Sequence, residues 1–105
     1  MICTTTPTIE GSPIKAYKGV VTGEEIIGTD LKADLCASIR DTFGGRSDLY
    51  EETLVEARET AMEEMQEQAT DLGANAIVGI NFNYEAVGPT NTMFMVAVSG
   101  TAVVI

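Results

Sequence analysis

The segment from about residue 48 to 72 constrains the fold most, because its apolar residues repeat with the period of an α-helix. They step by three or four positions and so share one helix face: Leu54, Ala57, Ala61, Met65, Ala69 and Leu72. Five glutamates form a second stripe about 200° away around the helix: Glu52, Glu56, Glu59, Glu63 and Glu67. The pattern predicts one long helix with a buried face and an acidic, solvated face, ended by Gly73.

Four segments have strand character, and the last one is apolar on both faces. Residues 2–6 and 14–27 precede the helices, with Gly19 and Gly23 in the second segment permitting a bulge or a close backbone approach. In residues 76–84, one predicted face carries Val78, Ile80, Phe82 and Tyr84, and the other carries Gly79, Asn81 and Asn83. Residues 92–105 place Met93, Met95, Ala97 and Val103 on one face, and Phe94, Val96, Val98, Ala102 and Val104 on the other.

The remaining periodic segment, residues 30–43, predicts a short amphipathic helix. The element order is then strand, strand, helix, helix, strand, strand, in a chain of 105 residues that has room for one domain, residues 1–105. These elements predict an α+β fold in which one long helix backs a small antiparallel or mixed sheet. A single helix covers only one sheet face, so we expect the short helix or another copy of the chain to cover the second.

The charge and the missing residue types argue against several functions. Sixteen acidic residues against six basic ones give a net charge of −10, which disfavours binding to nucleic acid and to anionic membranes. The chain has no histidine, and its two cysteines, Cys3 and Cys36, form no CxxC pair, so no soft-metal site is expected. We expect no catalytic residues and no cofactor, since neither Ser47 nor Tyr50 has an evident activating base. Whether the two thiols pair stays open, and the absence of a targeting segment predicts a cytoplasmic protein.

One corner of the sequence offers a candidate binding site. Residues 44–47, Gly-Gly-Arg-Ser, precede the long helix, whose free amides and positive end attract anions, although Asp48 and Glu51 oppose an incoming anion. The alternative is a capped turn with an ion-pair network between helices or across subunits. The candidate ligand-binding or subunit-interface residues are Arg40, Asp41, Arg46, Ser47, Tyr50, Glu51 and Arg58.

The chain's carboxylates and thioethers permit two further interpretations. The glutamate stripe could collect divalent cations at an oligomer surface, but a solvated outer face explains it as well. The methionines Met62, Met65, Met93 and Met95 could suggest a copper site, but their spacing fits core and interface packing better.

Several stretches together resemble the YbjQ-like family of small bacterial proteins, which is named for heavy-metal binding. They are TTTPTIEG at residues 4–11, GVVTGE at 19–24, IRDTFGGRS at 39–47, LGANAIVGI at 72–80 and MVAVSGTAV at 95–103. The resemblance implies a dodecin-like subunit assembled into a ring-shaped homo-oligomer, a pentamer, in which extra short strands join neighbouring subunits. Relatives carry acids where Asn81 and Asn83 stand, and two amides in their place weaken a hard-cation site.

The residues and the resemblance together lead to two functional hypotheses. The first is a non-enzymatic homo-oligomer that binds a small ligand or a divalent cation at its subunit junctions. The alternative is a purely structural or interaction module without a small-molecule ligand. No specific metal ligands are assigned.

Overall fold

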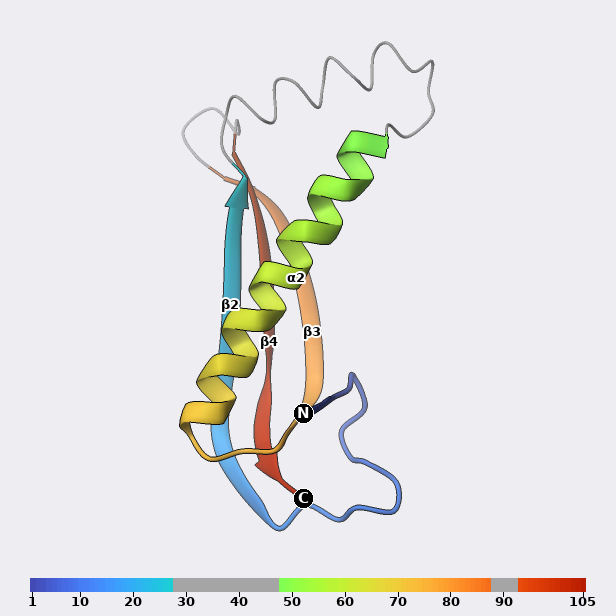
Figure 1. The fold of residues 1–105 in the computed structure, drawn as a ribbon, viewed down its shortest axis with the longest axis vertical. Coiled ribbons are helices and arrows are strands. Elements are labelled where there is room, and N and C mark those ends of the chain that lie inside the picture. The colour runs from blue at the N-terminus through green and yellow to red at the C-terminus, as the bar shows by residue number, and fades with distance from the viewer. Residues whose placement is uncertain (28–47, 88–92) are drawn as a thin grey trace.

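The computed structural model describes residues 1–27, 48–87 and 93–105, which form one helix packed on a four-stranded sheet (Figure 1). The strands are β1 (Ile2–Cys3), β2 (Ala16–Ile27), β3 (Ala76–Val87) and β4 (Met93–Val104), and the helix is α2 (Asp48–Asp71). The order across the sheet is β1-β3-β4-β2. The α+β class with one long helix on a small sheet is therefore confirmed, while the helix predicted over residues 30–43 lies outside the described residues.

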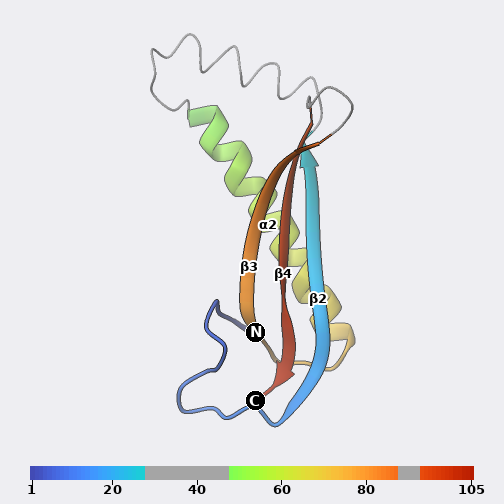
Figure 2. The same cartoon turned by 180° about the vertical axis from the view of Figure 1, so that it is seen from behind.

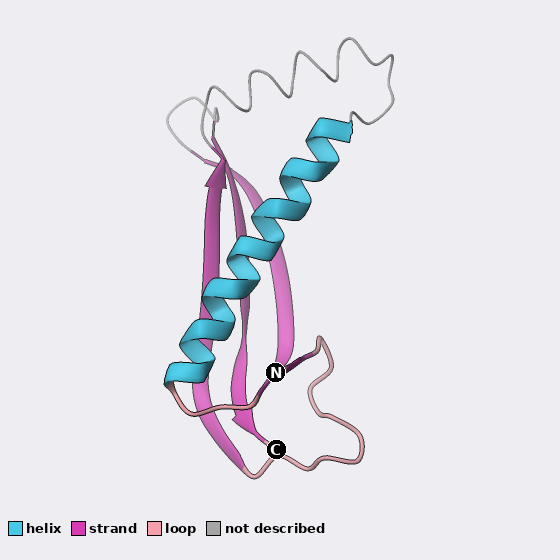
Figure 3. Cartoon of the chain, viewed as in Figure 1, coloured by secondary structure: helices cyan, strands magenta, loops and turns pink. Residues whose placement is uncertain are grey.

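The sheet is mixed, because its three long strands are antiparallel and β1 is not. Strand β4 lies in the middle and pairs with β2 on one side and β3 on the other, both antiparallel. The two-residue strand β1 pairs in parallel with the start of β3. Since β2 and β3 both run opposite to β4, they run in the same direction as each other (Figure 3).

Helix α2 crosses one face of the sheet diagonally, from the β3 side at its N-terminal end to the β2 side at its C-terminal end (Figure 1). Its buried stripe packs Ala61, Met65 and Ala69 against Val21 and other apolar residues of the sheet: Ile77, Ile80, Val98 and Ala102. The stripe predicted from the sequence is confirmed at Ala57, Ala61, Met65 and Ala69. Leu72 was wrongly placed in it and is 45% exposed, because the helix ends at Asp71 and Gly73 turns the chain away with a φ of 81°.

Two glycines of β2 confirm the predicted bulge and close approach. A register shift falls between Tyr17 and Gly19, where Gly19 has a φ of 128°. At Gly23 the strand lies directly against the backbone of α2, and an added Cβ would overlap the carbonyl group of Ala61. The smallest residue is therefore required for the helix to reach the sheet at this point.

A second bulge corrects the predicted alternation of β3. The register shifts between Val78 and Asn81, with Gly79 at a φ of 63°. Val78 consequently points away from α2 and packs with Ala76 and Val103, whereas Ile80 and Phe82 lie with the helix-side core. The strand also runs to Val87, three residues beyond the predicted end.

The sheet face away from α2 is only partly covered within the described residues (Figure 2). At its base, Ile9 and Ile14 of the N-terminal segment pack against Ala76, Val78 and Val103. The sequence pattern gave no sign of this cover, since these isolated isoleucines belong to no periodic run. Farther along, the exposed fraction is 72% for Tyr17, 76% for Val20 and 53% for Ile26, although Ile26 and Val20 are apolar strand residues.

Candidate functional site

Most of the predicted site residues lie where the structure describes no side chain. Arg40, Asp41, Arg46 and Ser47 lie outside the described residues. Tyr50 and Glu51 belong to the first turn of α2, where only the backbone is described.

Arg58 is the predicted site residue that the structure places fully. It lies exposed on α2, about two helical turns after Glu51. Within the described part of the chain, Arg58 forms no ion pair, so the predicted ion-pair network is not formed by the residues whose side chains are described.

Arg58 lines an open groove of about 450 Å³ between α2 and β3. Val55 and Met62 of the helix and Phe82 of the strand supply its apolar walls. The groove exists because α2 crosses the sheet over β2 and β4 and contacts β3 much less. The sequence did not predict that Phe82 would line a groove. Phe82 is left uncovered because the helix crosses the sheet diagonally, and the sequence does not show this path.

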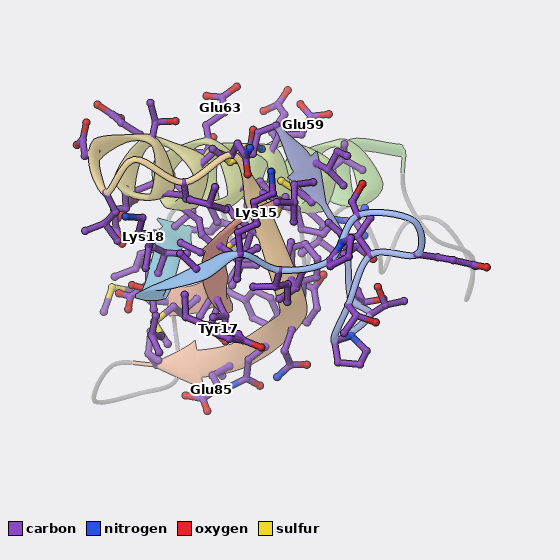
Figure 4. All side chains as sticks on the ribbon, turned by 90° about the horizontal axis from the view of Figure 1, so that it is seen from below. Lys15, Tyr17, Lys18, Glu59, Glu63 and Glu85 are labelled. Atoms are coloured by element: carbon purple, nitrogen blue, oxygen red, sulfur yellow. The ribbon has the colours of Figure 1, made fainter. Side chains whose placement is uncertain are left out.

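The charged rim of the groove is mixed and slightly acidic. Glu59, Glu63 and Gln66 line it together with Arg58. Figure 4 shows Glu59 and Glu63 on the helix side of the molecule, opposite Tyr17 and Glu85, which lie on the far side of the sheet. Two carboxylates beside one guanidinium make the described rim a poor site for a free anion and a better one for a ligand that carries both charges or a cation.

An aromatic pair extends the apolar surface of β3 beyond the groove. The rings of Tyr84 and Phe94 stack with their centroids 6.4 Å apart and an angle of 30° between the planes. Phe94 also packs with the cluster of Ile27, Ala57 and Val96 under the helix. Tyr84 keeps 42% of its surface exposed, so the aromatic surface is accessible from the β3 side.

A smaller hollow of about 200 Å³ lies on the opposite side of α2, beside β2. Glu25 and Ile27 of the strand and Glu56 and Thr60 of the helix line it. The two sides of the helix therefore differ in composition. The β3 side carries Arg58 together with Glu59 and Glu63, and the residues that line the hollow on the β2 side include Glu25 and Glu56 but no base.

The described residues do not fit a heavy-metal centre. Residues 1–27, 48–87 and 93–105 contain no group of three or more histidine, cysteine, aspartate or glutamate side chains arranged to hold a metal ion. Burial raises the pKa of the Cys3 thiol, against a smaller opposing effect of the nearby amino terminus. A raised pKa keeps the thiol protonated, whereas a soft metal binds the thiolate. Cys36 lies outside the described residues.

No helix in the described ranges is both long and apolar enough to cross a membrane.

The fold and the grooves define a small α+β chain with one helix on a mixed sheet, and the comparisons with known proteins give its family. The model of the YbjQ-like family, described as "Putative heavy-metal-binding", matches residues 1–105. The chain therefore belongs to this family, as its motifs indicated. A solved structure with a similar fold is a protein of unknown function of the DUF74 family from Pediococcus pentosaceus, with a TM-score of 0.63 and 18% sequence identity. The match covers 100% of this chain and 97% of that one.

Proposed function

We propose that this protein is a non-enzymatic homo-oligomer, a ring of five copies as the family resemblance implies, that binds a small ligand or ion where its subunits meet. The observation that carries the proposal is the presence of exposed apolar residues on the sheet face opposite α2. Val20 and Ile26 are more than half exposed there, and Met95 of β4, which pairs with Ile26, is only partly buried. Apolar strand residues are stabilised when another surface covers them and removes them from water.

The groove beside Arg58 supports a binding role at the junctions. Its volume lies within the range of small-molecule sites, and it combines apolar walls with a few charged groups. A neighbouring copy placed next to β3 would supply a further wall to this open groove. A ligand held there would contact Arg58 and the aromatic surface of β3.

A defined heavy-metal site finds no support among the described residues, in spite of the family's name. A strongly acidic helix nevertheless attracts loosely held cations, since Asp48–Asp71 contains nine acids and one base. Such a cation cloud would give apparent metal binding without a fixed stoichiometry, and it would be lost at physiological salt.

The alternative is a structural or interaction module whose grooves hold no small molecule. The position of Arg58 on a groove that also has apolar walls supports the binding role over this alternative.

Native mass spectrometry of untagged protein, purified without added metal, tests the proposal. We expect one assembly mass with a whole number of small adducts per subunit, retained after exchange from physiological salt. In Arg58→Ala we expect the same assembly with fewer adducts, while the control Lys18→Ala, which removes an exposed base outside the groove, keeps them. An assembly without adducts would favour the structural alternative, and a monomer would refute self-association.

A further inference from the structure

The groove between α2 and β3 has the shape of a site for an extended chain. It follows α2 from Val55 to Gln66, which is about 16 Å of helix. Pockets for compact ligands enclose most of the ligand surface, whereas this groove is open to solvent. An extended polypeptide rises about 3.3 Å per residue, so about five of its residues match the length of the groove.

The walls of the groove offer an anchor point for an apolar side chain. Val55 is 39% exposed on the helix, and Met62 and Phe82 are only partly buried. Met62 and Phe82 both pack against the main core cluster, so they are held in place before any ligand arrives. A partner that covers these three side chains removes apolar surface from water, and this burial supplies affinity.

The rim of the groove favours a basic partner. Glu59 and Glu63 are exposed on the helix side of the molecule (Figure 4) and lie four residues apart on α2, so their Cβ atoms are about 6 Å apart. Two basic side chains that lie two residues apart in an extended segment have nearly the same spacing, about 6.6 Å. The rest of α2 adds to the attraction, because Asp48–Asp71 contains nine acids and one base.

Arg58 distinguishes a polypeptide from a simple cation as the occupant. Its guanidinium repels a metal ion or a free amine in the groove, but it can donate hydrogen bonds to carbonyl oxygens. A polypeptide has a carbonyl group at every residue, and its basic side chains can face the two glutamates at the same time. A second copy of this chain is a poor match for the same rim, since it has ten more acids than bases.

We propose that the groove between α2 and β3 binds a short, basic and amphipathic segment of another protein, in which an apolar side chain lies between two lysines or arginines. Alternate side chains of an extended segment point to opposite sides, so the apolar one enters the groove beside Met62 and Phe82. The two bases then point toward the rim, where they face Glu59 and Glu63. The inference rests on the proposed function, since it takes this groove as the binding site, and it names the class of ligand.

Fluorescence anisotropy tests the inference with a labelled seven-residue peptide in which lysine and leucine alternate. One control peptide has glutamate in place of lysine, and the other has serine in place of leucine. We expect only the lysine–leucine peptide to bind, because the first control reverses the charge and the second removes the apolar anchor. Equal binding of the lysine–serine peptide would overturn the inference, since attraction to the acidic helix alone would explain it.

Paired charge variants test whether the peptide binds at the groove. Glu59→Gln with Glu63→Gln neutralises the rim, and the control Glu64→Gln with Glu67→Gln removes the same charge from exposed positions of α2 that do not line the groove. Two exposed charge pairs are worth roughly fivefold to tenfold in affinity, and we expect this loss for the first pair. For the control pair we expect less than about a twofold loss at physiological salt. Equal losses would overturn the groove as the site.

A matched pair of apolar variants tests the anchor. Val55→Ser removes part of the groove wall and should weaken peptide binding by about fivefold, whereas Leu72→Ser, at an exposed position outside the groove, should not change it. Equal affinities of the two variants would count against the anchor.

Light scattering and native mass spectrometry of the same sample separate this inference from the proposed function. A single copy that still binds the lysine–leucine peptide refutes self-association and supports the groove as a peptide site. An assembly that keeps adducts dependent on Arg58 but binds no peptide overturns this inference alone.

Discussion

Replacing Gly23 by alanine should destabilise the protein more than any other addition of a single methyl group to β2. The new Cβ would overlap the backbone carbonyl of Ala61, so the helix has to move by more than about one ångström to restore a normal contact. A backbone group cannot rotate away as a side chain can, and Ala61 lies in the same core cluster as Met65 and Ala69. Overpacking costs about 1 to 3 kcal/mol, and the rigid partner places this site near the upper end, about 3 kcal/mol.

Thermal and guanidinium unfolding at a fixed chain concentration measure this loss. For a domain of this size, a loss of about 3 kcal/mol lowers the melting temperature by roughly 12 °C or more. Gly100→Ala is the comparison, because its Cβ would overlap Cγ2 of Ile77 less severely, at 2.7 Å, than the Cβ at Gly23 overlaps the helix backbone, and we expect a smaller loss. Thr22→Ala, at an exposed position, should change the free energy of unfolding by less than about 0.5 kcal/mol. If Gly23→Ala unfolds with the wild-type free energy, α2 does not approach β2 as described.

Three further changes probe other parts of the fold. Met65→Ala empties a fully buried site and should lower the free energy of unfolding by about 2 to 5 kcal/mol in guanidinium. Met62→Ala, at a partly buried position, should lower it by about half as much, and equal losses would contradict the described core. Asn75→Ala removes two hydrogen bonds to the backbone of Ile105, at 2.8 and 3.1 Å, and should cost about 1 kcal/mol by the same assay, with no change at all counting against the bonds. The pKa of the Cys3 thiol is raised in the folded chain, so this thiol ionises first in the unfolded chain as the pH rises. The free energy of unfolding should therefore fall through the pH range in which a free thiol ionises, and Cys3→Ser should abolish that fall.

The helix and the middle strand could be predicted from the sequence because their patterns depend on burial alone. Ala57, Ala61, Met65 and Ala69 follow the helical period, and every one of them is buried against the sheet. The alternation along β4 is likewise reproduced, with Val96 and Val98 under the helix and Val103 on the other face.

The errors arose where the backbone departs from a regular period. A bulge at Gly79 turns Val78 to the face opposite Ile80. The prediction assumed that side chains alternate at every residue, and this rule does not reveal an inserted residue. Leu72 continues the helical spacing in the sequence, but it lies past the last helical residue and is exposed.

The candidate site was less accessible to sequence reasoning than the fold. Arg58 was singled out as one of few bases in an acidic chain, and the structure places it in a groove. The partners of that groove, Val55 and Phe82, depend on the angle at which the helix crosses the sheet, and residue spacing does not determine this angle.

The mass of the untagged chain in solution, measured by light scattering over a series of concentrations, tests the central claim most directly, namely that copies of this chain associate and cover one another's exposed apolar strand residues. Val20 and Ile26 are more than half exposed in the single chain. The account predicts the mass of an assembly for the wild-type chain, and a lower mass when Val20 and Ile26 are both replaced by glutamate. The mass of one copy at every concentration would contradict it.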